Sequence, residues 1–98
     1  MLQVEIHPEA YNELEQSRSW YENQAKDLGI KFLNEVELAI NTIRQFPDIW
    51  SSYCEKTRRF LLHRFPFAIV YRHNKNKIQV FAIMHLRRKP WYWKDRKF

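Results

Sequence analysis

The residues best suited to chemistry lie in the second half of the chain, where basic and aromatic side chains interrupt short apolar runs. Guanidinium groups stay charged and present a planar fork that can hold a phosphate or an anionic transition state. Histidine is the side chain that ordinarily changes charge near neutral pH, so His85 could transfer a proton there. Trp91, Tyr92 and Trp93 could stack on an unpaired base. The cations that could contact a nucleic acid or another target are Arg58, Arg59, Arg64, Arg72, Arg87, Arg88 and Lys89.

Structural roles compete with these functional ones. Strand-like alternation over residues 91–93 would put Trp91 and Trp93 on one face and Tyr92 on the other, so the two tryptophans could equally belong to the core. A structural hydrogen bond near the end of a strand is the alternative role for His85. Among all these residues, Arg88 is the strongest functional candidate.

The charge of the chain is unevenly distributed along its length. Residues 1–48 carry four Lys and Arg against nine Asp and Glu, whereas residues 49–98 carry thirteen against two, and the net charge is +6. The basic half therefore predicts a polyanion or an acidic protein segment as partner. The alternative is a solvated surface that only keeps the protein soluble.

The composition argues against several kinds of enzyme site. One glycine leaves no P-loop and no dinucleotide-binding turn. The four histidines and Cys54 are not at metal-ligand spacing, so we expect neither a metal nor another cofactor. Two carboxylates in the basic half leave little material for a paired-carboxylate mechanism.

The length of 98 residues predicts a single domain over residues 1–98. No apolar run approaches the roughly 20 residues that a membrane-spanning helix requires, and the N-terminus lacks the pattern of a secretory signal. Cys54 has no second cysteine to pair with. We therefore expect a cytoplasmic protein without a membrane partner.

The first half of the chain predicts a strand and two helices. Residues 2–6 alternate apolar and polar side chains, as a half-buried strand does. Pro8 then opens a helix, and Gly29 is expected to end it by adopting positive φ. The expected buried stripe of this first helix is Tyr11, Leu14, Arg18, Tyr21, Ala25 and Leu28.

A second helix is expected from about Ile30 to Phe46, because Pro47 would stop it. Its expected buried face is Leu33, Val36, Ile40 and Ile43, with Phe32 and Ala39 beside it and Glu35 on the other side.

Three apolar runs in the second half have the length and composition of strands. They are residues 60–62, 65–71 and 78–84, and residues 73–77 form a polar turn between the last two. An antiparallel hairpin closed by this turn would bring Tyr71 close to Ile78. The whole order predicts an α+β fold in which an N-terminal strand and an antiparallel helical hairpin pack on one side of a mostly antiparallel sheet.

Two stretches of the basic half carry a resemblance to a known family. The segment from Arg58 or Arg59 through Phe65-Pro66-Phe67 to Arg72, and the ending His85 to Trp93, resemble the RelE/ParE superfamily of toxins from type II toxin–antitoxin modules, also described as plasmid-stabilisation proteins. The resemblance covers nearly the whole chain. It implies a small α+β toxin that a cognate antitoxin neutralises by wrapping its C-terminal segment over the helices and sheet.

This resemblance implies one of two targets. RelE-like members cut messenger RNA on the ribosome, and that activity would use Arg88 and Arg59 for transition-state charge, His85 or a lysine for proton transfer and Tyr92 for base stacking. ParE-like members poison DNA gyrase and would use the basic, aromatic surface for binding. Ala68 stands where RelE-like nucleases have a catalytic arginine, which slightly favours gyrase over the ribosome. A non-toxic module that binds nucleic acid through its basic surface is the remaining alternative.

Overall fold

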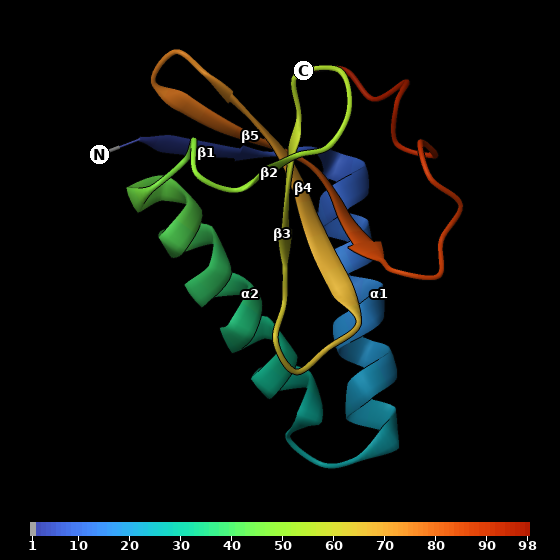
Figure 1. Cartoon of the computed structure of the whole chain (residues 1–98). Helices are drawn as coiled ribbons and strands as arrows, with labels where there is room; N and C mark the ends of the chain where they lie inside the picture. Colours follow the sequence, from blue (N-terminus) through green and yellow to red (C-terminus); the bar gives the residue numbers. More distant parts are fainter. Residues whose placement is uncertain (1) are drawn as a thin grey trace.

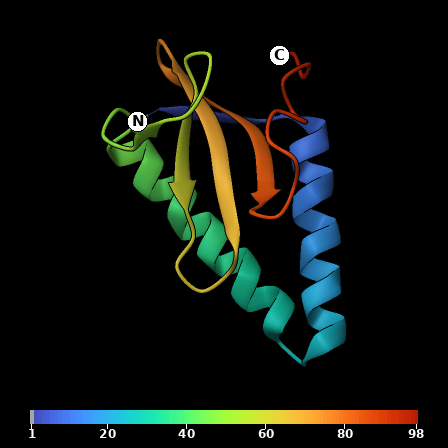
Figure 2. The same cartoon turned by 45° about the vertical axis from the view of Figure 1, so that its right-hand side comes forward.

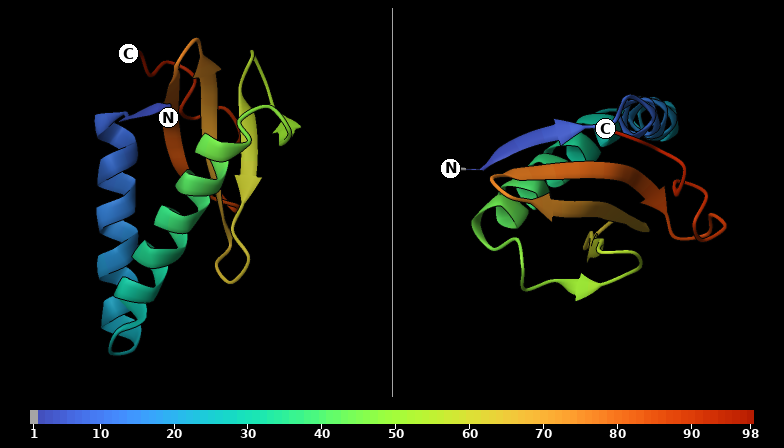
Figure 3. Two further views of the ribbon diagram at one scale, coloured as in Figure 1. Left: turned by 90° about the vertical axis from the view of Figure 1, so that its left-hand side faces the viewer. Right: turned by 90° about the horizontal axis from the view of Figure 1, so that it is seen from above.

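The computed structural model describes residues 2–98 and has two layers, a pair of helices and a mixed sheet (Figure 1). Figure 3 shows both helices on the same side of the sheet, from the side and from above. The predicted α+β fold is therefore confirmed. The elements in chain order are β1 (Gln3–Ile6), α1 (Pro8–Gln24), α2 (Leu28–Gln45), β2 (Ser51–Ser52), β3 (Arg58–Leu61), β4 (Phe67–Asn74) and β5 (Lys77–His85).

The sheet has the strand order β1-β5-β4-β3-β2. β1 pairs with β5 in parallel, although the two strands lie at opposite ends of the sequence, and the other neighbours pair antiparallel. The mostly antiparallel sheet is thus as predicted. β5 and β4 form its centre. Residues 67–71 of β4 and residues 78–84 of β5 are all buried, whereas the hairpin tip between them is more exposed.

The β4–β5 hairpin is tighter than the sequence predicted. Its turn consists of Lys75 and Asn76 alone, so the flanking residues of the predicted turn belong to the strands. Tyr71 is paired with Val80, two residues beyond Ile78, and both Tyr71 and Ile78 belong to the main core. A register shift next to Tyr71 inserts Phe81 as an extra residue in β5.

The predicted stripe of α1 is correct at Leu14 and at Tyr21, which packs against the main core, but wrong at Tyr11 and Ala25. Ala10 and Leu14 are buried, whereas Tyr11 is 53% exposed and Ala25 is exposed. In the first turns of α1 the small Ala10 is buried in the main core in place of the large Tyr11 ring. At the start of this helix the His7 Nδ1 accepts a hydrogen bond from the Glu9 N–H, 3.0 Å away, and caps the helix.

Gly29 does not end α1 through positive φ, as the sequence predicted. Asp27 adopts the left-handed conformation, with φ of 67°, and Gly29 lies inside α2. A Cβ atom on Gly29 would stand 2.6 Å from the Arg18 carbonyl oxygen. The chain therefore uses its single glycine for the close approach of two helices.

The main core fills the space between the helices and the sheet. The α2 residues Val36 and Ile43 are buried in it as predicted, together with Phe32 and Ala39, whereas Leu33 and Ile40 of the predicted face are only partly buried. Glu35 is a correction to the predicted polar side of this helix. Its carboxylate accepts hydrogen bonds from the main-chain N–H groups of His63 and Arg64 and so holds the loop between β3 and β4.

A smaller core covers the opposite face of the sheet. It combines strand residues with Trp93 from the C-terminal segment, and Tyr53, Cys54 and Tyr92 pack against it. Figure 2 shows the C-terminal segment, in red, returning from the end of β5 towards the beginning of α1. No helix within residues 2–98 is long and apolar enough to cross a membrane.

Candidate functional site

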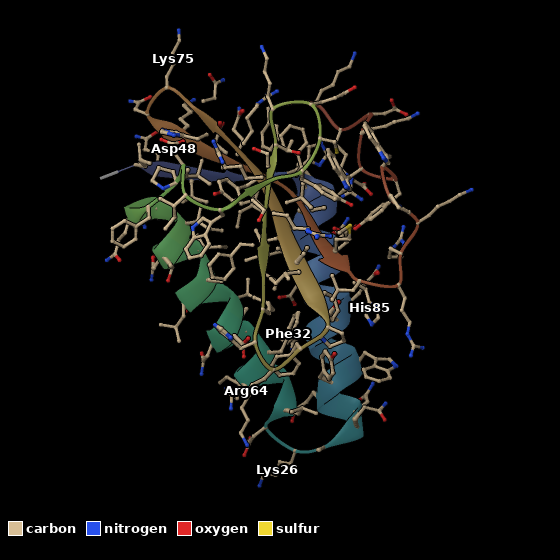
Figure 4. The ribbon with its side chains drawn as sticks, viewed as in Figure 1. Lys26, Phe32, Asp48, Arg64, Lys75 and His85 are labelled. Carbon is tan, nitrogen blue, oxygen red and sulfur yellow. The ribbon has the colours of Figure 1, made fainter. Side chains whose placement is uncertain are left out.

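A cleft of about 520 Å³ lies between α1, the end of β5 and the segment that follows β5. It brings together four of the residues singled out in the sequence, namely His85, Arg87, Arg88 and Tyr92. Figure 4 shows His85 beside α1 at the end of β5. The other lining residues come mainly from α1 and from the end of the sheet that α1 covers: Glu13, Gln16, Ser17, Trp20, Tyr21, Pro66, Phe67 and Ile83. The cleft thus has a largely aromatic lining with cations at one side.

Tyr92 and Arg88 form a stacked pair in this cleft. The Arg88 guanidinium carbon lies 3.9 Å from the centre of the Tyr92 ring, within the range of a cation–π contact. Burial raises the pKa of Tyr92 well above its usual range, and the neighbouring Glu13 raises it further, so the phenol stays protonated. One face of the Tyr92 ring is therefore already occupied by Arg88.

His85 makes the structural hydrogen bond that the sequence left open. Its Nδ1 accepts a hydrogen bond from the Arg87 N–H at 3.0 Å, and its ring meets the Phe67 ring edge-on with 5.0 Å between centroids. An accepting Nδ1 places the proton of the neutral ring on Nε2. His85 can therefore donate a hydrogen bond into the cleft, but its other nitrogen is engaged.

Glu13 and Arg96 form an ion pair that the sequence did not reveal. Arg96 Nη2 donates to Glu13 Oε2 at 2.8 Å, and Arg96 Nη1 donates to Glu13 Oε1 and to the Phe81 carbonyl at 3.1 and 2.9 Å. Glu13 Oε1 also accepts from the Ile83 N–H at 3.0 Å. The two side chains are 14% and 12% exposed. This pair fixes the C-terminal segment to α1 and β5. The predicted stripe of α1 did not include Glu13, which precedes the buried Leu14.

Two of the predicted arginines on β3 lie away from the cleft. The Arg59 guanidinium carbon stands 4.8 Å from the centre of the Tyr53 ring. Arg58 donates a hydrogen bond to the Trp50 carbonyl oxygen at 2.7 Å. The structure therefore does not bring Arg59 together with Arg88.

Two further predicted cations, Arg64 and Arg72, are held by other side chains. Arg64 lies in the loop between β3 and β4 (Figure 4) and pairs with Glu35 at 3.3 Å. Arg72 donates two hydrogen bonds, of 3.2 and 3.0 Å, to Gln79 Oε1. Neither side chain lines the cleft.

The predicted alternation over residues 91–93 is wrong, because these residues lie in turns and not in a strand. Trp91 adopts positive φ, 71°, and is 44% exposed, whereas Trp93 is 2% exposed. Trp93 thus belongs to the core and offers no surface to a target. Trp91 and the exposed Lys89 remain accessible. Within residues 2–98, no group of three or more His, Cys, Asp and Glu side chains is placed to hold a metal ion.

Comparison with known proteins gives a family and a fold. The family model of the ParE toxin of the type II toxin–antitoxin system parDE matches residues 4–90. A solved structure described as "Chromosomal ParDE TA system from P. aeruginosa" is similar in fold, with a TM-score of 0.64 and 18% sequence identity over 89% of this chain and 98% of that chain. No curated protein sequence is significantly similar to the chain.

Proposed function

Because the chain belongs to the ParE toxin family of type II toxin–antitoxin systems, we propose that it arrests growth by acting on DNA gyrase until a cognate antitoxin neutralises it. A gyrase target requires the protein to act in the cytoplasm. The alternative target is the ribosome with its messenger RNA, where the protein would be a nuclease. One observation in β4 carries the preference for gyrase.

That observation is the environment of Ala68. Its position corresponds, through the resemblance to RelE-like nucleases, to a catalytic arginine. Ala68 is fully buried in the smaller core, together with Met84 and Trp93. Arg64 and Arg72 are the nearest cations in sequence, but each is held by another side chain. Neither of them lines the cleft that contains Arg88, so neither stands in for the missing arginine.

The remaining residues of a nuclease site are also engaged elsewhere. The Arg88 guanidinium carbon lies 3.9 Å from the centre of the Tyr92 ring, and that of Arg96 lies 5.1 Å from the same centre. Arg59 stacks on Tyr53, outside the cleft. His85 keeps Nδ1 in a structural hydrogen bond. By contrast, a gyrase-binding surface needs no proton transfer, and the exposed cations and Trp91 can serve it.

The test is induction of the protein alone, followed within minutes by mapping of messenger RNA ends and by a DNA-damage reporter. We expect growth arrest with DNA-damage signalling and without new ends on translated transcripts. Arg88→Ala tests a cation that lines the cleft, and Lys75→Ala at the distant hairpin tip is the control for loss of one exposed charge.

Three outcomes would contradict the proposal. New cuts at codon positions that vanish in Arg88→Ala would establish the ribosome-dependent nuclease. Growth arrest with neither new cuts nor DNA-damage signalling would point to another target. Harmless expression without any antitoxin would favour a non-toxic nucleic-acid-binding module.

A further inference from the structure

We propose that the cleft between α1 and the end of β5 binds an extended, acidic segment of the antitoxin, whose main chain continues the sheet beside β5. The proposal rests on the proposed function, because it takes an antitoxin as the partner. Three features of the cleft carry it: an open strand edge, an aromatic wall and unpaired cations.

The open edge arises because β1 is shorter than β5. The last paired residue of β1 is opposite Val80, and β5 continues to His85. The Leu86 N–H donates to the Pro66 carbonyl, so residues 84 and 86 bond towards β4, and residues 83 and 85 face the other edge.

Side chains already occupy part of this edge. Glu13 accepts from the Ile83 N–H, and Arg96 donates to the Phe81 carbonyl. Within residues 2–98, the Ile83 carbonyl and the His85 N–H have no such partner. In a parallel ladder, the N–H of an incoming residue opposite Met84 donates to the Ile83 carbonyl. The carbonyl oxygen of the same residue accepts from the His85 N–H.

The wall of the cleft that α1 and the beginning of β4 form is aromatic. Trp20 is 57% exposed, and Tyr21 and Phe67 line the cleft behind it. Side chains alternate along an extended chain, so the residues before and after the paired one point towards this wall. Apolar side chains at those two positions would cover Trp20, which is the kind of residue that dominates binding energy at interfaces.

The opposite side of the cleft is cationic. Arg87 and Arg88 make no salt bridge with a carboxylate in the part of the chain that the structure describes. Glu13 is the carboxylate that lines the cleft, and Arg96 neutralises it. The paired residue of the segment points to this side, where a carboxylate can bind arginine through two hydrogen bonds. The segment that fits is therefore extended and has an acidic residue between two apolar ones.

The direct test measures amide hydrogen exchange of the toxin, free and with the small protein encoded beside it. In the free toxin the His85 amide is expected to exchange fast, since nothing accepts its hydrogen bond. In the complex we expect exchange at His85 to slow by about tenfold or more. The Leu86 amide, which already donates to Pro66, is the internal control and should remain protected in both samples.

A second measurement compares dissociation constants of matched variants. Trp20→Ala is expected to weaken the complex by about tenfold or more, because the apolar anchor contact is lost. Leu38→Ala, on the outer face of α2 and 67% exposed, is the control and should bind as the unchanged toxin does. Thermal unfolding of both variants checks that each is folded.

The outcomes separate this proposal from the proposed function. A complex in which the His85 amide still exchanges fast and Trp20→Ala binds normally would overturn the docking site and leave an antitoxin partner in place. Failure of the neighbouring protein to bind at all would overturn both. Slowing of the His85 amide by purified gyrase, and not by the neighbouring protein, would assign the cleft to the target and overturn the antitoxin assignment.

Discussion

The two faces of the sheet are covered in different ways. Regular helices cover one face, and their buried side chains recur at helical spacing. Irregular chain covers the other face, where Trp93 fills the core and the Arg96–Glu13 pair fixes the segment across 83 residues of sequence. Both faces bury apolar side chains, but the covering of the second face also depends on the specific contact between Arg96 and Glu13. The candidate cleft lies where the two coverings meet.

Phe32→Ala should have the largest effect, because it removes the centre of the helix-covered core. The Phe32 ring is fully buried and lies 5.3, 5.1 and 5.0 Å from the ring centres of Tyr21, Phe65 and Phe67. We expect the free energy of unfolding to fall by about 3–5 kcal/mol. Urea denaturation measures it, and a loss below about 1 kcal/mol would show that this face is not the main source of stability.

Arg96→Met should rank second and tests the other face. Removing the guanidinium leaves the largely buried Glu13 carboxylate without its cation, which should cost about 2–3 kcal/mol. Arg18→Met is the matched control, because the Arg18–Glu15 pair is 36% and 43% exposed and should contribute less than about 0.5 kcal/mol. Equal losses in the free energy of unfolding for the two variants in urea denaturation would show that the Arg96–Glu13 pair stabilises the fold no more than the exposed Arg18–Glu15 pair does.

Gly29→Ala tests how closely the helices of the first face approach each other. Alanine normally stabilises a helix interior by about 1 kcal/mol relative to glycine. Here the added Cβ would stand 2.6 Å from the Arg18 carbonyl oxygen, so we expect a net loss of about 1–2 kcal/mol. A higher thermal midpoint for this variant would contradict the close approach.

Glu35→Gln should have the smallest effect and depends on pH. Burial alone would raise the pKa of Glu35, but hydrogen bonds from the Arg64 and His63 N–H groups and the Arg64 side chain lower it below its usual 4.5. The stabilisation by this carboxylate is therefore present above pH 4.5 and is lost as the pH falls through the folded-state pKa. We expect the variant to lose about 1 kcal/mol near pH 7 and to show a flatter decline of stability in acid. An unchanged pH profile in urea denaturation would contradict this role.

The sequence predicts the helix-covered face better than the other one. The buried Val36 and Ile43 of α2 follow from their spacing, since a helix repeats locally. The pairing of Tyr71 with Val80 was missed because the extra residue Phe81 leaves no pattern in the sequence. The Glu13–Arg96 pair was missed because it joins residues at opposite ends of the chain.

The candidate site was predictable to the extent that it is local. His85, Arg87, Arg88 and Tyr92 meet in one cleft because they follow one another after β5. Arg59 lies on β3 and does not join them, because its side chain stacks on Tyr53. The α1 wall with Trp20 was not foreseen, because nothing in the sequence of α1 shows that it borders the end of β5.

The most direct test of the account is the supercoiling activity of purified gyrase with increasing amounts of this protein. We predict that supercoiling falls as the protein is added and that prior binding of the cognate antitoxin restores it. Unchanged supercoiling in the presence of excess protein that still arrests growth in cells would contradict gyrase as the target.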